Sequence, residues 1–215
     1  MIFSAHPYTS RLSDDELAIF LFHGVVKNND WKVRNYTRKH LPEADFDQLI
    51  EALAKEGQAL SMDEVRSLQQ EGKAWPKKSF VISFDDGFEN NASVAAPILE
   101  KHKVPAIFYI TTDFIVHQSK SWIDRIEACF ESLVSASLQL TWRDGPVTIN
   151  SPSSKKEVLQ EIRLEVKKDP SLDFHAWTSE LLSQCKMDDR SDTNNELDRK
   201  MSWAQVQELN QGLFT

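Results

Sequence analysis

Apolar and polar residues form blocks along the first half of the chain that predict strands and helices in turn. The run at 17–22 is continuously apolar, which is typical of a strand buried on both faces. The segments 79–84 and 106–111 have the same character. Helices are predicted between them at 42–57, where apolar residues recur at i, i+3, i+4 and i+7, at 61–72, and at 91–102. This order predicts an α/β fold built on a parallel sheet.

The pattern changes after the third predicted strand. A helix with one apolar stripe is expected at 122–134, followed by a small hairpin at 138–149 and by further helices. The segment 186–200 has no apolar period and is expected to be an exposed loop. We therefore expect a single domain over 1–215 that contains a helical insertion at 122–200.

The charge balance argues against partners with phosphate backbones. Lys and Arg number 25 against 33 Asp and Glu, and the net charge of -8 gives no general attraction to nucleic acid or anionic membranes. No stretch approaches the roughly 18 apolar residues of a membrane span, and the amino terminus lacks the apolar run of a signal segment. We expect no nucleic-acid partner, no transmembrane segment and a cytoplasmic location. Cys129 and Cys185 lie on predicted amphipathic helices, so buried thiols are expected rather than a disulfide framework.

Two adjacent carboxylates, Asp85 and Asp86, directly follow the predicted strand at 79–84. Like charges a few ångströms apart raise each other's pKa unless a cation neutralises them, and a metal ion is the usual solution. Gly87 can take the positive φ of a tight turn, which would bring both carboxylates around one cavity. One carboxylate can then bind a metal while the other handles a proton. For an isolated Asp-Asp-Gly, an ordinary turn in which an aspartate caps the next segment is the commoner interpretation.

The residues around this pair resemble a known family. The segment at 79–88, Ser-Phe-Val-Ile-Ser-Phe-Asp-Asp-Gly-Phe, resembles the first motif of polysaccharide deacetylases, which are carbohydrate esterase family 4 with a NodB-like homology domain. Further segments that look like parts of this family lie at 19–25, 96–99, 104–112, 122–127 and 201–203. Together they extend the resemblance over most of 17–212.

The resemblance implies a distorted (β/α) barrel that hydrolyses acetyl groups from a polysaccharide or another glycan, by N-deacetylation or O-deacetylation. In this family the first motif aspartate, here Asp85, is the general base, and the second, here Asp86, binds zinc or a similar divalent ion. An acetylated carbohydrate is the implied partner, and a divalent metal, zinc in the complete enzyme, is the implied cofactor. A bound metal lowers the pKa of its water from about 15.7 toward about 7, so that a carboxylate suffices as the base.

The chain departs from the family's pattern in its histidines. The family completes its metal site with two histidines in a His-Ser/Thr-x-x-x-His arrangement soon after the helix that here begins at Met201. This chain has no such pair, and no two of its histidines are closer in sequence than His102 and His117. One carboxylate holds zinc weakly, because zinc sites typically supply about three or more protein ligands. We therefore expect the sequence to be the front part of a truncated domain, with an incomplete barrel, weak or absent zinc binding and negligible activity alone.

His23 is the best-placed histidine, because it follows the first predicted strand and so lies on the same rim as Asp85. We expect it to pack or hydrogen-bond beneath the cavity, where it would contact substrate, rather than to bind the metal. His117 follows the third strand and is a weaker candidate. The remaining histidines, His6, His40, His102 and His175, are expected to face solvent.

Two other functions compete with deacetylation as interpretations of the sequence. One is a half-domain that binds a glycan or a partner protein without catalysis. The other is a phosphatase with an aspartyl nucleophile, but that motif separates its two aspartates by one residue, whereas Asp85 and Asp86 are adjacent. The sequence thus favours deacetylation first and non-catalytic binding second.

Overall fold

The computed structural model describes residues 3–186 and 195–214. The chain folds as two compact units. Unit 1 consists of Met1–Asn29, Lys39–Ser119 and Asn195–Thr215, and unit 2 consists of Asp30–Arg38 and Lys120–Asn194. Unit 2 includes a short segment that precedes the region expected to be an insertion. The single domain with an insertion at 122–200 stays a prediction.

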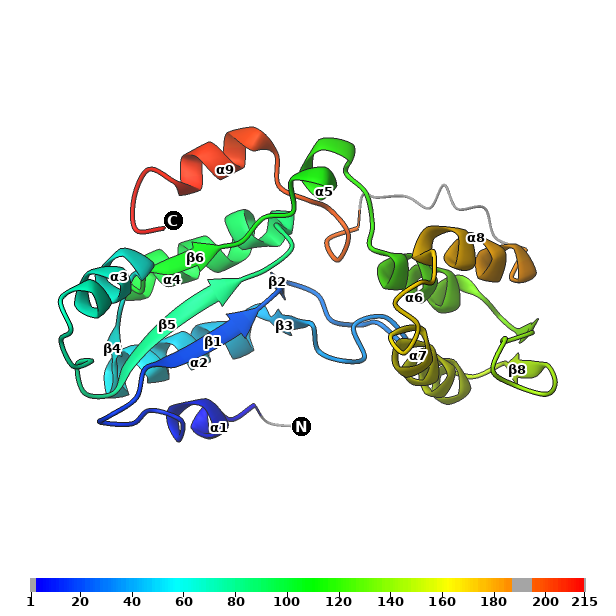
Figure 1. The fold of residues 1–215 in the computed structure, drawn as a ribbon, viewed down its shortest axis with the longest axis horizontal. Helices are drawn as coiled ribbons and strands as arrows, with labels where there is room; N and C mark the ends of the chain where they lie inside the picture. The colour runs from blue at the N-terminus through cyan, green and yellow to red at the C-terminus, as the bar shows by residue number, and fades with distance from the viewer. Residues whose placement is uncertain (1–2, 187–194, 215) are drawn as a thin grey trace. The chain divides into compact units, whose positions relative to one another are not determined.

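Unit 1 is built on a parallel sheet with β5 at its centre (Figure 1). The strands are β1 (Ala18–Phe22), β4 (Gln58–Ala59), β5 (Ser79–Phe84) and β6 (Ala106–Phe108). β5 pairs in parallel with each of the other three. The predicted α/β fold with a parallel sheet is therefore confirmed, and the strands of the described chain form an open sheet.

One face of this sheet carries the main core of unit 1. The helices α2 (Glu43–Glu56) and α4 (Ala96–His102) contribute to that core. The ring of Phe22 packs edge-on against Phe46, with 5.4 Å between centroids, and lies 5.6 Å from the ring of Phe84. The predicted stripe of α2 is confirmed, because all four of its apolar positions, Phe46, Leu49, Ile50 and Leu53, are buried.

The other face of β1 is open, and the expectation that this strand is buried on both faces is wrong. Ile19 is 61% exposed and Leu21 is 54% exposed. In the described part of the chain β1 pairs only with β5, so it is an edge strand. An apolar run alone does not distinguish an edge strand from a central one, because the sequence of one strand does not reveal its neighbours.

The helix α3 (Met62–Gln70) packs beside the same sheet. Ser61 begins it with a capping box, in which its hydroxyl accepts from the Glu64 N–H while the Glu64 carboxylate accepts from the Ser61 N–H. Val65 of this helix shares a small buried cluster with Val81 of β5. The elements α2, α3 and α4 thus cover β5 from both sides.

The remaining elements of unit 1 surround the sheet. A π-helical turn, η1 (Asn91–Ala95), leads into α4, where Pro97 occupies the first turn. The other elements are α1 (His6–Thr9), β2 (Gly24–Val26), β3 (His40–Pro42), α5 (Thr112–His117) and α9 (Trp203–Leu209). β2 and β3 form a separate two-stranded parallel sheet.

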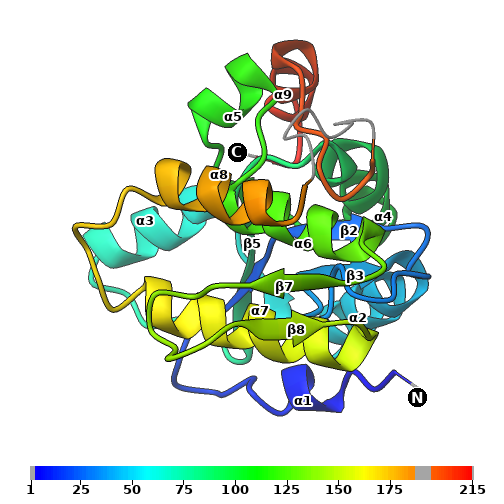
Figure 2. The same ribbon diagram turned by 90° about the vertical axis from the view of Figure 1, so that its right-hand side faces the viewer.

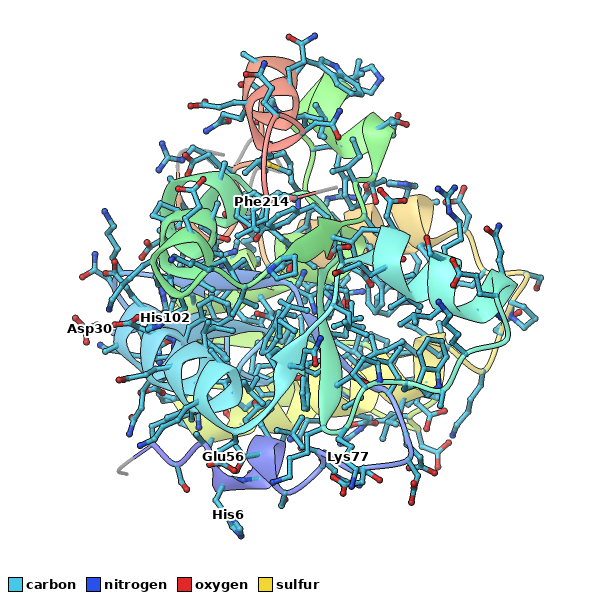
Figure 3. All side chains as sticks on the ribbon, turned by 90° about the vertical axis from the view of Figure 1, so that its left-hand side faces the viewer. His6, Asp30, Glu56, Lys77, His102 and Phe214 are labelled. Carbon is cyan, nitrogen blue, oxygen red and sulfur yellow. The ribbon has the colours of Figure 1, made fainter. Side chains whose placement is uncertain are left out.

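Two labelled histidines in Figure 3 have different surroundings. His6 points outward, as expected. His102 is partly buried instead, because its ring Nε2 lies 2.7 Å from a carboxylate oxygen of Asp47, on α2. The bonds from Lys101 and His102 hold the pKa of the Asp47 carboxyl below its ordinary value. Phe214, which Figure 3 also labels, packs edge-on against Phe108 with 5.5 Å between the ring centroids.

Unit 2 has its own core. The helices α6 (Trp122–Ser132), α7 (Pro152–Val166) and α8 (Phe174–Gln184) accompany an antiparallel hairpin, β7 (Ala136–Leu138) and β8 (Val147–Ile149) (Figure 2). The hairpin predicted at 138–149 is confirmed in part, because its second strand lies within that range, whereas its first strand, at 136–138, shares only Leu138 with it. The buried side chains of this core include Ile126, Phe130, Leu138, Ile149, Leu159 and Ile162.

A buried carboxylate in unit 2 has a cationic partner. The carboxylate of Glu127 lies 2.6 Å from a guanidinium nitrogen of Arg163, and burial raises the pKa of Glu127. Cys129 and Cys185 are both buried free thiols, as predicted. Among the residues that the structure describes, no helix combines the length and apolar character needed to cross a membrane.

Candidate functional site

The candidate site is the turn that follows β5. The N–H of Asp85 donates to the carbonyl of Phe22 at 3.0 Å, which continues the pairing of β5 with β1 by one residue. Asp86 and Gly87 then both adopt left-handed backbone conformations, with φ of 72° and 70°. The chain therefore leaves the sheet in a tight turn, and both carboxylates are only partly buried there.

A distant segment holds this turn in place. The N–H of Met201 donates to the carbonyl of Gly87 at 3.0 Å, and the N–H of Glu89 donates to the carbonyl of Arg199 at 2.9 Å. Between these two bonds, Phe88 and Lys200 form an antiparallel bridge. The turn is thus fastened on both sides by backbone hydrogen bonds to residues more than a hundred positions away.

The predicted exposed loop at 186–200 is therefore corrected in part. Residues 187–194 lie outside the described residues, but Leu197, Asp198 and Lys200 are buried, at 3%, 1% and 3% exposure. Their burial follows from the pairing with the turn after β5. The polar composition of this segment predicted solvent exposure. That prediction failed because a backbone pairing between distant segments leaves no periodic pattern in the sequence.

Lys39 contributes a charge that sequence reasoning missed. Its Nζ lies 3.4 Å from Oδ2 of Asp86, and the two side chains are 17% and 28% exposed. The same Nζ lies 4.6 Å from the centroid of the Phe88 ring. Lys39 precedes β3, whose first residue is aligned with Gly24 in β2. No motif marks this position, and only the pairing of β2 with β3 brings it near the end of β1.

His23, His117 and His175 differ in how far they are buried. His23 is half-buried and follows β1, and the N–H of Asp85 bonds to the residue before it, so the two backbones adjoin. The role of His23 toward substrate stays a prediction. His117 is exposed and its Nε2 lies 3.5 Å from Asp113, on its own helix. His175 is exposed, as expected.

His40 is buried, so the expectation that it faces solvent is wrong. It is 3% exposed, its Nδ1 lies 3.2 Å from the side-chain nitrogen of Asn90, and its ring packs edge-on against Phe88 at 4.6 Å. Space for it depends on Gly24, where an added Cβ would come within 2.1 Å of the His40 ring. Asn90 in turn accepts from the N–H of Val25 at 3.3 Å. This packing positions the residues that flank Lys39 and Asp86.

The described residues do not by themselves fit a zinc ion. Across 3–186 and 195–214, no cluster of three or more His, Cys, Asp or Glu side chains is arranged to hold a metal. Near the turn, Asp86 supplies one carboxylate, and it forms an ion pair with the ammonium group of Lys39. Zinc sites typically need about three protein ligands.

Two cavities of about 410 Å³ each occur elsewhere in unit 1. One lies between η1, α4 and α9 and is lined by Ala92, Pro97, Gln205 and Phe214 among others. The other lies beside α1 and β1. Neither is lined by Asp85, Asp86 or His23, so the candidate site rests on the turn after β5 and not on these cavities.

The chain belongs to the polysaccharide deacetylase family, because the family described as Polysaccharide deacetylase matches residues 72–205, more than half of its length. The matched segment includes Asp85, Asp86 and the pairing segment around Lys200. No curated protein matches the sequence.

Several solved structures resemble the chain at low identity. IcaB from Ammonifex degensii is 21% identical, with 54% of this chain and 49% of that chain covered and a TM-score of 0.43. Streptococcus pyogenes deacetylase PplD in complex with acetate is 23% identical, with 48% and 46% covered and a TM-score of 0.39. The BpsB deacetylase domain from Bordetella bronchiseptica is 14% identical, with 94% and 54% covered and a TM-score of 0.40. The chain spans about half the length of these structures.

Proposed function

We propose that the chain forms part of an enzyme that hydrolyses acetyl groups from a carbohydrate, with Asp85 as the general base. The observation that carries the proposal is the Asp-Asp-Gly turn at the carboxyl end of β5, inside the segment that matches the polysaccharide deacetylase family. Catalytic residues gather at this end of parallel strands in α/β folds. The whole enzyme's sheet is proposed to close into the distorted barrel that the resemblance implies.

Asp85 suits the role of base because its carboxylate is partly open to solvent and, among the described residues, makes no side-chain hydrogen bond or ion pair. It can accept a proton from a water molecule as that water attacks the acetyl carbonyl, and a positioned base of this kind contributes about 10²–10⁴-fold. His23, on the adjoining backbone, is proposed to contact the sugar.

Asp86 is proposed as one metal ligand of the complete site. A metal ion bound there would polarise the acetyl carbonyl or its attacking water. Since the described residues supply too few ligands, the other ligands would have to come from residues outside them. Binding of a divalent ion therefore belongs to the proposal and not to the described site.

Acetate release is the decisive measurement. The protein expressed from its natural gene is incubated with N-acetylglucosamine oligomers and with acetylated xylan, and acetate is quantified. Asp85→Asn is expected to lower the rate by about 10²–10⁴-fold. Asp113→Asn, an exposed carboxylate that forms an ion pair with His117 on α5, serves as the control and should keep the rate. Full activity in Asp85→Asn would refute the proposed base.

A second candidate is a glycan-binding protein without catalysis. It is favoured by the same shortage of metal ligands around Asp86 in the described chain. Binding of acetylated oligosaccharide by the natural protein with no release of acetate, with or without added zinc, would select this candidate over the hydrolase.

A further inference from the structure

We infer that Lys39 is the counter-ion of Asp86 in this chain, so that an ammonium group neutralises the carboxylate for which the family's chemistry calls for a metal ion. Lys39 is thus a positioning residue for Asp86 and a competitor of any divalent cation that binds there. The competition rests on the proposed function, because it takes Asp86 as a metal ligand. The ion pair itself does not.

Lys39 is held at this place by contacts on two sides. Its Nζ lies 3.4 Å from Oδ2 of Asp86 and 4.6 Å from the centroid of the Phe88 ring. Phe88 is fully buried, and the His40 ring packs edge-on against it. A fixed aromatic face attracts a cation placed over it. The lysine side chain therefore lies in a defined position and not among the many conformations of a surface lysine.

Asp86 has a particular need for a positive neighbour. It follows Asp85 directly, so two carboxylates share one turn. The Asp86 side chain is only 28% exposed, so water solvates its charge incompletely. Its backbone is also fixed in a left-handed conformation, which limits where the carboxylate can turn. Repulsion between the carboxylates is reduced when a cation lies beside one of them.

The same position would be unfavourable for a divalent ion while Lys39 is there. An ammonium group a few ångströms from a doubly charged ion repels it, and the repulsion is only partly screened at a partly buried site. Occupation of Asp86 by a metal thus requires the Lys39 side chain to move away. Substituting Lys39 should strengthen binding of a metal at Asp86, whereas substituting an unrelated lysine should not.

Thermal unfolding in the absence of metal tests the ion pair. Lys39→Met keeps the apolar stem against Phe88, and Asp86→Asn keeps a residue that tolerates the left-handed backbone. Each single substitution should lower the unfolding midpoint by about 2–4 °C, the scale for one such interaction in a chain of this length. The double variant should fall no further than either single one. Additive shifts would overturn the pairing.

A matched cycle controls for the loss of charge. Lys77 and Asp14 form an ion pair in the same unit, with Nζ 3.0 Å from Oδ2, but their side chains are 79% and 49% exposed. Surface pairs of this kind contribute little. Lys77→Met and Asp14→Asn should therefore each move the midpoint by less than about 1 °C.

Zinc titration by calorimetry tests the competition. Lys39→Met should lower the zinc Kd by about tenfold relative to the unsubstituted protein, and adding Asp86→Asn should remove the gain. Lys77→Met should leave the Kd unchanged. An equal Kd in the protein with and without Lys39→Met, or no detectable binding by either at millimolar zinc, would overturn the competition.

The two proposals fail in different ways. Loss of acetate release in Asp86→Asn combined with additive thermal shifts would leave the proposed function in place and refute the ion pair. Non-additive thermal shifts in a protein that releases no acetate from any substrate would do the reverse.

Discussion

Two consecutive left-handed residues, Asp86 and Gly87, make the turn that carries both candidate carboxylates. A left-handed backbone costs a residue with a side chain about 1–2 kcal/mol, which is lower for aspartate than for most residues and absent for glycine. Crowding adds to this cost at Gly87, where an added Cβ would lie 3.3 Å from Cγ2 of Ile110. The turn therefore depends on glycine for two separate reasons.

Gly87→Ala is expected to destabilise the fold by about 1–3 kcal/mol, since it combines an unfavourable backbone with a close contact. Urea unfolding measures the loss. Gly72→Ala separates the two causes, because Gly72 has φ of 62° but nothing within 4 Å of an added Cβ, so only the backbone cost of about 1 kcal/mol remains. Gly145→Ala, in open space without a positive φ, should have no such cost. Equal losses at all three positions would contradict this explanation.

Whether a residue of the candidate site could be predicted from the sequence depended on whether it stands in a local sequence motif. Asp85, Asp86 and Gly87 stand in a recognisable motif after an apolar run, and the sequence marked them as candidates. Lys39 and His40 stand in no such pattern. Their positions arise from the pairing of β3 with β2 and from the space that Gly24 leaves, which are contacts between distant segments. Polarity alone predicted that His40 is exposed to solvent, whereas its side chain is buried.

Among the elements, helices were easier to predict than the surroundings of strands. The period of α2 fixes which of its faces is buried, because a helix carries that information in its own sequence. For β1, an unbroken apolar run gave no indication that one face and one edge would be open in the described chain. The sheet order, and with it the exposure of Ile19 and Leu21, follows only from the assembled structure.

The helix α6 of unit 2 holds the segment 30–38 by side-chain to backbone hydrogen bonds. Glu131 of α6 accepts hydrogen bonds from the backbone N–H groups of Lys32, Val33 and Arg34, at 3.1, 2.7 and 2.9 Å. Burial alone raises the pKa of the Glu131 carboxyl, but the three N–H bonds outweigh it, and the pKa lies below its ordinary value. The ionised form is therefore the one that ties residues 30–38 to α6.

Glu131→Gln should lower the free energy of unfolding by about 1–2 kcal/mol at pH 7, because hydrogen bonds to a charged acceptor are stronger than those to an amide. A depressed carboxyl pKa stabilises the fold above its ordinary value of 4.5, and this stabilisation is lost as the pH falls through the lower folded-state pKa. The difference between the two proteins should thus shrink at pH 3. Urea titrations at both pH values measure it, with Glu180→Gln, at an exposed position on α8, as the control. A difference independent of pH would contradict the role of the charge.

On the scale of the whole chain, the notable feature is that the two units have separate apolar clusters. The cluster around Phe46 draws on β1, β5, α2 and α4 of unit 1, and the cluster around Phe130 draws on α6, α7, α8 and the hairpin of unit 2. The sequence indicated this division through the change of pattern after the third strand. It did not indicate that residues 30–38 join the second unit, because that segment lacks an apolar period of its own.

Separate cores predict separate losses of stability. Phe130 and Phe46 are both fully buried, and truncation of a buried phenylalanine typically costs about 3–5 kcal/mol. Phe130→Ala should therefore speed amide hydrogen exchange throughout α6, α7 and α8 while β5 keeps its protection, and Phe46→Ala should do the opposite. Each variant is the control for the other, since both remove the same side chain. Faster exchange in both units from either substitution would mean that the chain unfolds as one cooperative structure.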